Sequence, residues 1–441
     1  MSDYTTPDPR TPELRTPDLR TEVFGLAPDE DASTGGRFAQ WLDAESIGFH
    51  DGTQDPEDIA QFLEAYRNDR RVLWSVHDDA QPAGALGYPV GTYGTMAHTM
   101  NVGASHIEAH QITAVSVRAS HRRRGILRSM MTRDLREAKD RGTPLAILTA
   151  SEATIYGRFG FGSATFTQSV EVDVSERFEI TAPASGTTTL VAREHAVRLA
   201  EDIFASFHAG TFGSVGRQYA YARRASGEWG RERPVEDRSV RMAVHYDAAG
   251  APTGYVSYRF AGWEKTPRTM KVVDLVASTP SAYLELWRYL GSLDLVQVVT
   301  WDEAPRDDVL PWALRDRRGY SVKATDDVLW LRMLDVPAAL EARSYRGSGS
   351  LVLEVLDDLG LAAGSFALSV SDGVARVRSV EDGSGADITL SVNALGSLYL
   401  GGVHAATLAA AGGLSAADAA AVELLDTLFG RSREPYCITH F

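Results

Sequence analysis

The segment Gln111-Ile-Thr-Ala-Val-Ser-Val-Arg-Ala-Ser-His-Arg-Arg-Arg-Gly-Ile-Leu-Arg128 passes from an apolar run, through a basic turn, into the start of an amphipathic run. Its first part, residues 111–117, has the apolar and β-branched composition of a buried strand. Residues 126–141 repeat apolar side chains at helical spacing, and Gly142 ends this pattern. Residues 144–149 predict a second buried strand. Strand, turn, helix and strand in this order predict a right-handed β-α-β unit of an α/β fold.

The basic turn of this unit has the properties that a pyrophosphate requires. Arg122, Arg123 and Arg124 supply positive charge, and Gly125 permits close approach of the backbone. The start of the following helix supplies free amides. A basic surface loop and a nucleic-acid contact are the alternative interpretations of the same residues. The position of the turn, between a buried strand and an amphipathic helix, favours the phosphate site.

The composition of the whole chain limits its class. Its 441 residues are too many for one compact core, so we expect two or three domains. Lys and Arg number 44 against 59 Asp and Glu, and the net charge of -15 attracts cations rather than nucleic acid or an anionic membrane. The one cysteine, Cys437, excludes an internal disulfide framework and a cysteine-based zinc site. No signal peptide is visible and no apolar run reaches the ~18 residues of a membrane span, so we expect a soluble, cytoplasmic protein.

The order of the first unit recurs later in the chain without its basic turn. Residues 239–246 and 254–260 predict a hairpin, which a strand over 270–277, a helix over 280–290 and a strand over 295–300 follow. The connection between this strand and helix is only Ser278-Thr-Pro280, which contains no arginine and no glycine. We therefore expect a structural copy that binds no cofactor.

The segments before the first unit are simpler. A Thr-Pro repeat with a five-residue period occupies residues 6–20 and carries few apolar side chains, so it predicts a disordered tail, with a recognition motif as the alternative. Residues 56–66 have the apolar spacing of a helix. Residues 72–76 and 84–88 predict a hairpin around a turn at 78–82.

A third region begins near Val336. It contains three predicted strands and then two helical stretches, the strands covering residues 365–370, 374–380 and 386–392. Ser415 and Asp418 predict a capping box for the last helix, residues 416–429. The tail over 431–441 is not helical and carries several apolar side chains, so we expect it to dock on the protein.

The basic turn resembles a known motif. Arg122-x-x-Gly125-x-Leu127 is similar to the acetyl-CoA loop of the GNAT N-acetyltransferase superfamily, although that motif usually ends in Gly or Ala where this chain has Leu127. Longer motifs resemble the Eis (enhanced intracellular survival) family: Val115-Ser-Val117, His121-Arg-Arg-Arg-Gly-Ile-Leu-Arg128, Thr149-Ala-Ser-Glu152, Ile155-Tyr-Gly-Arg-Phe-Gly-Phe-Gly162, Trp330-Leu-Arg-Met-Leu-Asp-Val-Pro-Ala-Ala-Leu-Glu-Ala-Arg343 and Leu395-Gly-Ser-Leu-Tyr-Leu-Gly401. These motifs are spread across all three regions, so the resemblance covers nearly everything after the N-terminal tail.

The resemblance implies mixed α/β sheets in two tandem GNAT-like domains, followed by an α+β domain similar to sterol carrier proteins. The implied division is a disordered tail at 1–20, a catalytic domain at 21–183, a degenerate GNAT-like domain at 184–332, and a sterol-carrier-like domain at 333–441 whose C-terminus reaches the active site. The family further implies a homohexamer that uses acetyl-CoA as co-substrate to acetylate amines of aminoglycoside-type polycations.

The family motif also assigns cofactor contacts. Val115, Ser116 and Val117 would pair their backbone with the pantetheine arm, a role that is compatible with a core position for the Val115 side chain. The pyrophosphate would be held by Arg123, Arg124, Gly125, Ile126, Leu127 and Arg128. Ser151 and Glu152 would line the same cofactor, and a plain helix N-cap is the alternative role of Ser151.

Two catalytic roles follow from the same resemblance. Tyr156 would be the general acid, because a phenol with a reference pKa of ~10 can protonate the thiolate that amine attack expels. A packed aromatic side chain is the alternative. The base would be the terminal carboxylate of Phe441, which must be partly desolvated or act through water because an α-carboxyl has a reference pKa of ~3.3–3.7. A frayed end is the alternative. The family more often has an acidic residue where this chain has His440, so substrate charge recognition is expected to differ.

The remaining candidates are structural. Cys437 is expected to be a small buried side chain rather than a nucleophile, and His106 and His110 lack a third metal ligand, so no metal is expected. The leading hypothesis is acetyl-CoA-dependent N-acetylation of primary amines on polycationic small molecules. The alternatives are acetylation of protein lysines and a non-enzymatic carrier of a hydrophobic ligand. The basic turn together with Tyr156 favours the enzyme.

Overall fold

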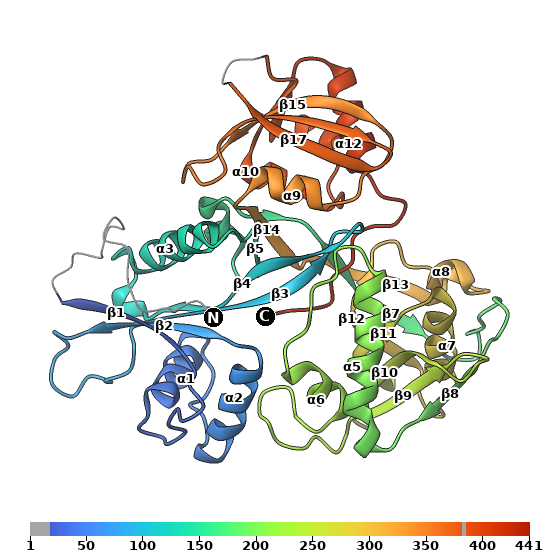
Figure 1. Ribbon diagram of the computed structural model, residues 1–441. Coiled ribbons are helices and arrows are strands. Elements are labelled where there is room, and N and C mark those ends of the chain that lie inside the picture. Colours follow the sequence, from blue (N-terminus) through green and yellow to red (C-terminus); the bar gives the residue numbers. More distant parts are fainter. Residues whose placement is uncertain (1–17, 382–384) are drawn as a thin grey trace.

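The computed structural model describes residues 18–381 and 385–441, which form three lobes, each around its own β-sheet (Figure 1). Residues 6–17 of the predicted tail over 1–20 lie outside the described residues. The last residues of the Thr-Pro repeat, in contrast, are part of the ordered fold. Leu19 and Arg20 already belong to the first strand and pair with Asp78 and His77. The ordered fold therefore begins before residue 21.

The first lobe contains a seven-stranded sheet in the order β1-β2-β3-β4-β5-β14-β6. Its strands are β1 (Leu19–Gly25), β2 (Val72–Asp78), β3 (Gly91–Asn101), β4 (His106–Val117), β5 (Leu145–Thr149), β6 (Gly162–Ser163) and β14 (Leu329–Met333). Helices α1 (Arg37–Gly48) and α2 (Pro56–Asn68) cover one face, and α3 (Ile126–Asp140) covers the other (Figure 1). Strands β4 and β5 are parallel and α3 connects them, so the predicted β-α-β unit is confirmed.

The hairpin predicted over 72–76 and 84–88 is wrong in its second strand. Strand β2 pairs instead with β3, which starts at Gly91, and residues 79–90 form a long connection. Pro82, Pro89 and the left-handed Gly84 interrupt the extended backbone in this connection, which explains why the apolar residues around 86 form no strand.

The second lobe repeats the architecture of the first. Its sheet has the order β13-β7-β12-β11-β10-β9-β8. The strands are β7 (Phe166–Asp173), β8 (Thr187–Leu190), β9 (Arg241–Tyr246), β10 (Pro252–Phe260), β11 (Thr269–Ala277), β12 (Val298–Pro305) and β13 (Tyr320–Asp327). The helices are α5 (Arg193–Gly210), α6 (Ala220–Ser226), α7 (Pro280–Gly291) and α8 (Leu310–Ala313). The predicted hairpin, helix and parallel strand pair of this unit are present, with β12 starting three residues later than expected.

The two sheets exchange strands at their boundaries. β7 precedes residue 183 in the chain but pairs with β12 and β13 in the second sheet. β14 lies almost entirely before residue 333 but pairs with β5 and β6 in the first sheet. The structural limits of the two domains therefore differ from the predicted boundaries at 183 and 332, and the crossed strands tie the two lobes together.

The third lobe has a five-stranded sheet in the order β17-β16-β15-β18-β19. Its strands are β15 (Gly349–Leu356), β16 (Gly364–Ser371), β17 (Val374–Val380), β18 (Ile388–Ser391) and β19 (Leu414–Ala416). Its helices are α9 (Val336–Ala342), α10 (Val392–Tyr399), α11 (Ala405–Ala410) and α12 (Ala419–Phe429). The predicted capping box is wrong, because Ser415 lies in β19 and Asp418 itself caps α12 by accepting from the amide of Ala421.

Helix α10 fastens the third lobe to the first sheet. A Cβ at Gly162 would stand 2.0 Å from the carbonyl oxygen of Asn393, and a Cβ at Gly396 would stand 2.2 Å from that of Leu331. Only glycine permits so close an approach of two backbones. A buried ion pair joins the same lobes, with Arg332 Nη2 2.7 Å from Asp357 Oδ2. The tail after α12 then runs back between the other two lobes, where Figure 1 marks the C-terminus.

Candidate active site

The parallel strands β4 and β5 separate toward their carboxyl ends. Their last paired residues are Ile112 and Leu148, while β4 continues to Val117. A β-bulge lies just beyond this point, where Ala114 has a left-handed φ of 53° and its carbonyl accepts a hydrogen bond from Thr92 Oγ1 at 2.9 Å. The edge of β4 that faces away from β3 is therefore left without a strand partner around residues 115–117, as a bound extended arm requires.

The basic turn presents free amides at the start of α3. Arg123 and Gly125 both have left-handed backbone, with φ of 65° and 80°. Helix α3 begins at Ile126 without a side-chain cap, so its first amides have no partner from the turn. Ile126 itself packs into the core and contributes its backbone. A left-handed turn before the uncapped start of a helix of 15 residues has the geometry that anion sites use.

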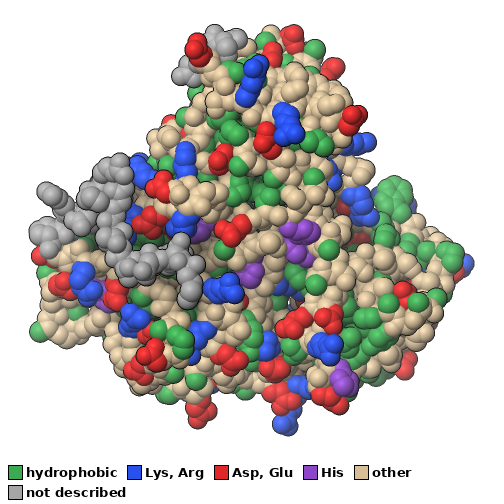
Figure 2. Space-filling view, in the orientation of Figure 1, with side chains coloured by type: hydrophobic (Ala, Val, Ile, Leu, Met, Phe, Trp, Pro, Cys, Tyr) green, Lys and Arg blue, Asp and Glu red, His purple; other side chains and the backbone are tan. Residues whose placement is uncertain are grey.

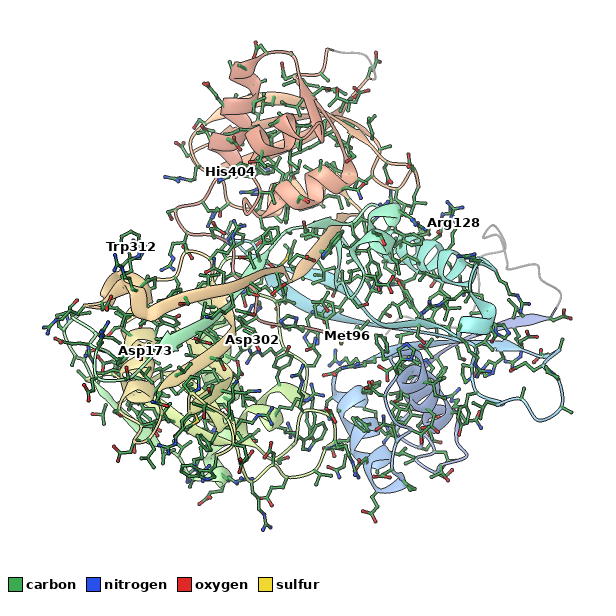
Figure 3. All side chains as sticks on the ribbon, turned by 180° about the vertical axis from the view of Figure 1, so that it is seen from behind. Met96, Arg128, Asp173, Asp302, Trp312 and His404 are labelled. Atoms are coloured by element: carbon green, nitrogen blue, oxygen red, sulfur yellow. The ribbon has the colours of Figure 1, made fainter. Side chains whose placement is uncertain are left out.

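The arginines of the turn are not equivalent. Arg124 Nη1 lies 3.1 Å from Asp78 Oδ2, and His121 Nε2 lies 2.8 Å from the same oxygen. The hydrogen bond from His121 is the largest cause of the lowered pKa of Asp78. Arg123 and Arg128 are exposed, and Figure 3 shows Arg128 on α3. The structure gives neither of them an ion-pair partner among the residues it describes. Their charge is therefore available to a phosphate, whereas that of Arg124 is shared with Asp78.

The segment after β5 contains three residues for which the sequence predicted a role in the site. Ser151 and Glu152 are exposed, and α4 (Ala153–Tyr156) begins after Glu152 without a side-chain cap, so Ser151 is not the helix cap. Tyr156 ends α4 and is 7% exposed. Burial, and secondly the charge of Glu152, raise the pKa of Tyr156 to about 12. Its phenol therefore stays protonated over the physiological pH range.

Asn393 of the third lobe and Arg332 of strand β14 hold the backbone that follows Tyr156. Asn393 Nδ2 donates to the carbonyls of Gly157 and Phe161 at 2.7 and 2.9 Å. The guanidinium of the fully buried Arg332 donates to the carbonyl of Phe159. Sequence reasoning did not identify either residue as part of the site, because each lies about 170 or more positions along the chain from its partner. The contacts place Tyr156 at a fixed position beyond β5.

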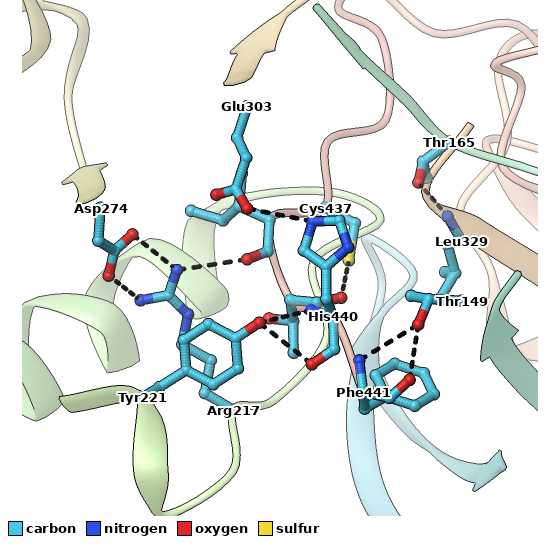
Figure 4. A network of polar contacts seen from close by, with 12 residues as sticks. Thr149, Thr165, Arg217, Tyr221, Asp274, Glu303, Leu329, Cys437, His440 and Phe441 are labelled. Carbon is cyan, nitrogen blue, oxygen red and sulfur yellow. Dashed lines mark hydrogen bonds and ion pairs between the residues drawn. The ribbon is translucent and has the colours of Figure 1, made fainter. Parts of the chain in front are cut away.

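The last residue of the chain, Phe441, contacts Thr149, the last residue of β5 (Figure 4). Thr149 Oγ1 donates to a carboxylate oxygen of Phe441 at 2.6 Å and accepts from the amide of Phe441 at 3.2 Å. Tyr156 follows Thr149 by seven residues and ends the short helix α4 that comes after β5. The end of β5 is the place where β4 and β5 separate.

The residues before Phe441 are held by the second lobe. The hydroxyl of Tyr221 accepts from the amide of His440 at 2.6 Å and lies 3.1 Å from its carbonyl, to which it donates. Arg217 donates to the carbonyl of Ile438 at 3.3 Å and makes a two-pronged pair with Asp274, at 2.6 and 2.9 Å. The terminus is therefore a docked end and not a frayed one.

A histidine–carboxylate pair adjoins the terminus. His440 Nε2 lies 3.1 Å from Glu303 Oε1, and both side chains are partly exposed (Figure 4). Glu303 belongs to β12, and no feature of its local sequence marked it as part of the site. The acidic charge expected at position 440 is therefore supplied next to it by Glu303.

The other candidates take structural positions. Cys437 is buried, and burial raises the pKa of its thiol to about 11. His106 and His110 lie on strand β4, not on a helix, and His110 Nε2 is 2.7 Å from the buried carboxylate of Asp134. Within residues 18–381 and 385–441, no cluster of three His, Cys, Asp or Glu could hold a metal ion. Over the same residues, no helix combines the length and apolarity needed to cross a membrane.

Comparison with known domain families agrees with this architecture. An acetyltransferase (GNAT) domain family matches residues 32–164, and a second acetyltransferase (GNAT) family matches residues 215–333. A sterol carrier protein domain family matches residues 336–438. These matches fall on the three lobes in order.

Whole-chain relatives extend the comparison. An uncharacterized N-acetyltransferase of Streptomyces griseus is 36% identical over 411 residues, 90% of this chain and 96% of that protein. The N-acetyltransferase Eis of Mycobacterium tuberculosis is 37% identical over 328 residues, 72% of this chain and 77% of that protein. The crystal structure of Eis1 from Mycobacterium abscessus matches with a TM-score of 0.76 at 29% identity, covering 95% of this chain and 100% of that one.

Proposed function

This chain belongs to the family of the N-acetyltransferases Eis and is an acyltransferase, and from that premise we propose that it transfers acetyl from acetyl-CoA to primary amines of polycationic small molecules. The observation that carries the proposal is the docking of the Phe441 carboxylate on Thr149, at the mouth of the gap between β4 and β5. The carboxylate therefore lies at the end of β5, from which the chain continues to Tyr156.

The residues of the first lobe fit acetyl-CoA. The unpaired edge of Val115, Ser116 and Val117 suits the amides of the pantetheine arm. The uncapped start of α3 suits the pyrophosphate, with Arg123 and Arg128 as its exposed cations. In this proposal Ser151 and Glu152 line the far side of the cofactor.

Tyr156 acts as the proton donor in the proposed reaction. The amine nitrogen bonds to the thioester carbonyl carbon, the carbon–sulfur bond breaks, and the electron pair leaves with the sulfur. Tyr156 donates its phenolic proton toward this sulfur. Its pKa of about 12 exceeds the ~8.5 of an ordinary thiol, so the phenol stabilises the developing thiolate chiefly by a strong hydrogen bond before the proton moves.

The carboxylate of Phe441 accepts the proton that the attacking nitrogen loses. Thr149 and Tyr221 hold it in place, directly and through His440 respectively. An α-carboxylate is a weak base in water, so its value here comes from position and from partial shielding from solvent. Phe441 is only partly buried, which leaves one side of the carboxylate accessible to a substrate amine.

A polycationic amine is the substrate that the charges favour. The chain carries a net charge of -15. Figure 2 shows histidine and acidic side chains in the middle of the face between the lobes, and Figure 3 shows Asp302 of β12 near the centre of the molecule. Glu303 stands next to Asp302 and is held beside the C-terminus by His440. The negative net charge and the partly exposed Glu303 beside the C-terminus favour a cationic substrate.

Two alternative functions remain distinguishable. A protein lysine acetyltransferase would use the same catalytic groups, but its substrate would have to bring a peptide backbone between two lobes that the crossed strands hold together. A carrier of a hydrophobic ligand would need an internal cavity in the third lobe and would have no use for a docked C-terminus. The position of Phe441 favours the acetylation of small amines.

Assembly and location are proposed on the family resemblance. We propose a homohexamer that works in the cytoplasm. Two tryptophans of the second lobe support association, since Trp263 is 67% exposed and Trp312 is 73% exposed. Exposed aromatic side chains of this size are typical of contact surfaces between subunits.

The test is a panel of amines incubated with acetyl-CoA, followed by thiol release and by the mass of the product. We expect aminoglycoside-type polycations to gain acetyl groups, and monoamines and a lysine-containing peptide to react far more slowly. Rapid acetylation of the peptide alone would support the protein-lysine function, and thiol release with no amine in the panel would contradict the proposal.

A further inference from the structure

The second lobe repeats the parts that surround the proposed cofactor site of the first. In the first lobe these parts are the ends of β4 and β5 and the start of α3. In the second lobe they are the ends of β11 and β12 and the start of α7 (Figure 1). Strands β11 and β12 pair in parallel only as far as Lys271 and Thr300, and their later residues do not pair with each other. The fold therefore repeats the gap between two parallel strands.

The start of α7 offers no site for a pyrophosphate. Thr279 caps this helix by accepting from the amide of Ala282 at 3.1 Å, and Pro280 has no amide hydrogen to donate. Neither arginine nor glycine occurs in the connection over 278–280. We therefore expect the ligand of this second gap to differ from a nucleotide cofactor.

A cavity of about 350 Å³ lies at this second gap, within the ~300–1,000 Å³ of small-molecule sites. Residues beyond the last pair of each strand line it, among them Ala277 of β11 and Trp301 of β12. Phe207 of α5, Tyr283 of α7 and the ring of Phe212 form further walls. The walls therefore suit a ligand whose body is aromatic or apolar.

The acidic residues of the cavity already have partners. Asp307 pairs with Arg433 at 3.0 Å, and Glu434 pairs with Arg306 at 2.5 Å. The buried Asp308 accepts hydrogen bonds from two tyrosine hydroxyls and one amide, each at 2.8 Å. Among the lining residues that the structure describes, no carboxylate is therefore left unpartnered for a cationic ligand.

Arg431, which also lines the cavity, has no such partner. Its Nη1 lies 2.7 Å from the hydroxyl and 3.5 Å from the carbonyl of Ser344, to which it donates, and its guanidinium stacks over Phe212 at 3.8 Å. No carboxylate within residues 18–381 and 385–441 pairs with it. Over the same ranges Nε and Nη2 have no hydrogen-bond partner, and neither atom is fully enclosed by protein. These two atoms form the edge through which a guanidinium binds a carboxylate by two parallel hydrogen bonds.

The surroundings of Arg431 leave its charge uncompensated. The side chain is half-buried, and burial, and secondly the charge of Arg346, lower the pKa of Arg431. Both effects destabilise an isolated cation. A bound anion would offset both of them, so the electrostatics of the cavity favour a negatively charged ligand.

We propose that this cavity is a second small-molecule site, which takes a carboxylic acid with an aromatic or apolar body. The carboxylate accepts from Nε and Nη2 of Arg431, and the body lies against Phe207 and Tyr283 at the ends of β11 and β12. This site is independent of the proposed function, because its occupancy can be measured without any acetyl transfer.

The first test compares two probes on the full native chain, 4-phenylbutanoate and 4-phenylbutanamide, which share one body and differ in charge. Affinities are measured by ligand-observed NMR titration with acetyl-CoA in excess, so that the basic turn of the first lobe is occupied. We expect saturable binding of 4-phenylbutanoate and at least tenfold weaker binding of the amide, which lacks the charge-assisted hydrogen bonds. Absence of saturable binding, or equal affinity of the two probes, would overturn the proposal.

A pair of variants locates the carboxylate. Arg431→Gln removes the cation and keeps a donor for Ser344, whereas Arg346→Gln removes the same charge from a nearby position that does not line the cavity. We expect Arg431→Gln to weaken 4-phenylbutanoate at least tenfold and Arg346→Gln to weaken it less than threefold. Equal weakening in the two variants would show a general effect of charge and overturn the role of Arg431. Circular dichroism checks that both variants fold, and if either does not, the two probes on the native chain decide the proposal.

Discussion

At the scale of single residues, the proposed chemistry depends on the hydroxyl group of Tyr156. The ring is packed edge-on against Phe161, and removal of the hydroxyl leaves this packing in place. We therefore expect Tyr156→Phe to fold and to bind acetyl-CoA normally but to lose ~10²–10⁴-fold in kcat. Steady-state kinetics together with calorimetric binding of acetyl-CoA check this. A variant within twofold of the native kcat would show that water protonates the thiolate.

The raised pKa of Tyr156 also predicts how kcat responds to alkaline pH. Its phenol is the protonated, active form below about pH 12, the pKa that burial and Glu152 produce. Turnover should therefore show no decline due to Tyr156 between about pH 8 and about pH 10, where an ordinary phenol of pKa ~10 would begin to ionise. The profile of kcat against pH measures this.

A second residue, Glu303, is expected to affect the binding of the substrate through its charge. Its carboxylate is one-quarter exposed beside His440, where a substrate ammonium would arrive. We expect Glu303→Gln to raise the KM for a polycationic amine about three- to fivefold, the value of one partly exposed ion contact, with the KM for acetyl-CoA unchanged. Glu176→Gln, at an exposed position of the same lobe, is the control. Equal KM values in the two variants would place the substrate elsewhere.

Some residues of the candidate site could be predicted from the sequence, and others could not. Arg123, Gly125 and Tyr156 stand in contiguous motifs, so their local pattern carried the prediction. Asn393 and Arg332 contribute through contacts made across hundreds of positions, which no local pattern records. The end of β2 likewise gave no sign that Asp78 would take up the charge of Arg124.

At the scale of elements, the start of helix α3 is the part that we propose holds the cofactor. By sequence, Arg123 and Arg124 are equivalent candidates for binding the pyrophosphate, but Asp78 already engages Arg124. We expect Arg123→Ala and Arg128→Ala each to weaken acetyl-CoA about tenfold or more, as for loss of a charge-assisted bond to phosphate. Arg124→Ala should cost less. Calorimetric titration ranks the three variants, and a larger loss for Arg124 than for Arg123 would contradict this account of the turn.

Helix α7 provides the internal comparison for α3. Its start is capped by Thr279 and carries Pro280, so it lacks the free amides of α3. We expect calorimetry to give one acetyl-CoA per chain. A stoichiometry of two per chain would show that the second lobe also binds the cofactor.

Most elements could be predicted because each is defined by local periodicity. The helix predicted over 126–141 and the strand predicted over 144–149 have their own apolar spacing, and in the structure they end at Asp140 and Thr149. The exchange of β7 and β14 between the sheets could not be predicted in this way. These strand pairings join residues 148 to 188 positions apart, and the sequence of an isolated strand does not specify its partner.

At the scale of the whole molecule, the site is assembled from three lobes and one tail. The first lobe supplies β4, β5 and the start of α3, the second lobe supplies Tyr221 and Glu303, and the third lobe supplies the support behind Tyr156. The tail leaves the third lobe after α12 and ends at Thr149 of the first. Apolar residues near the end of the sequence predicted that the tail docks. They did not predict that the tail passes the carboxyl ends of β11 and β12 on the way.

The most direct test of the central claim is to change the end of the chain. Adding two glycines after Phe441 converts its carboxylate into a neutral amide and moves the new charge several ångströms away. Since near-attack geometry is lost over ~1 Å, we expect kcat to fall at least ~10²-fold, with acetyl-CoA affinity retained because its turn is in the first lobe. The same two residues added before Met1 provide the control. Equal kcat values from the two extended chains would contradict a catalytic role for the terminal carboxylate and leave Phe441 as an anchor.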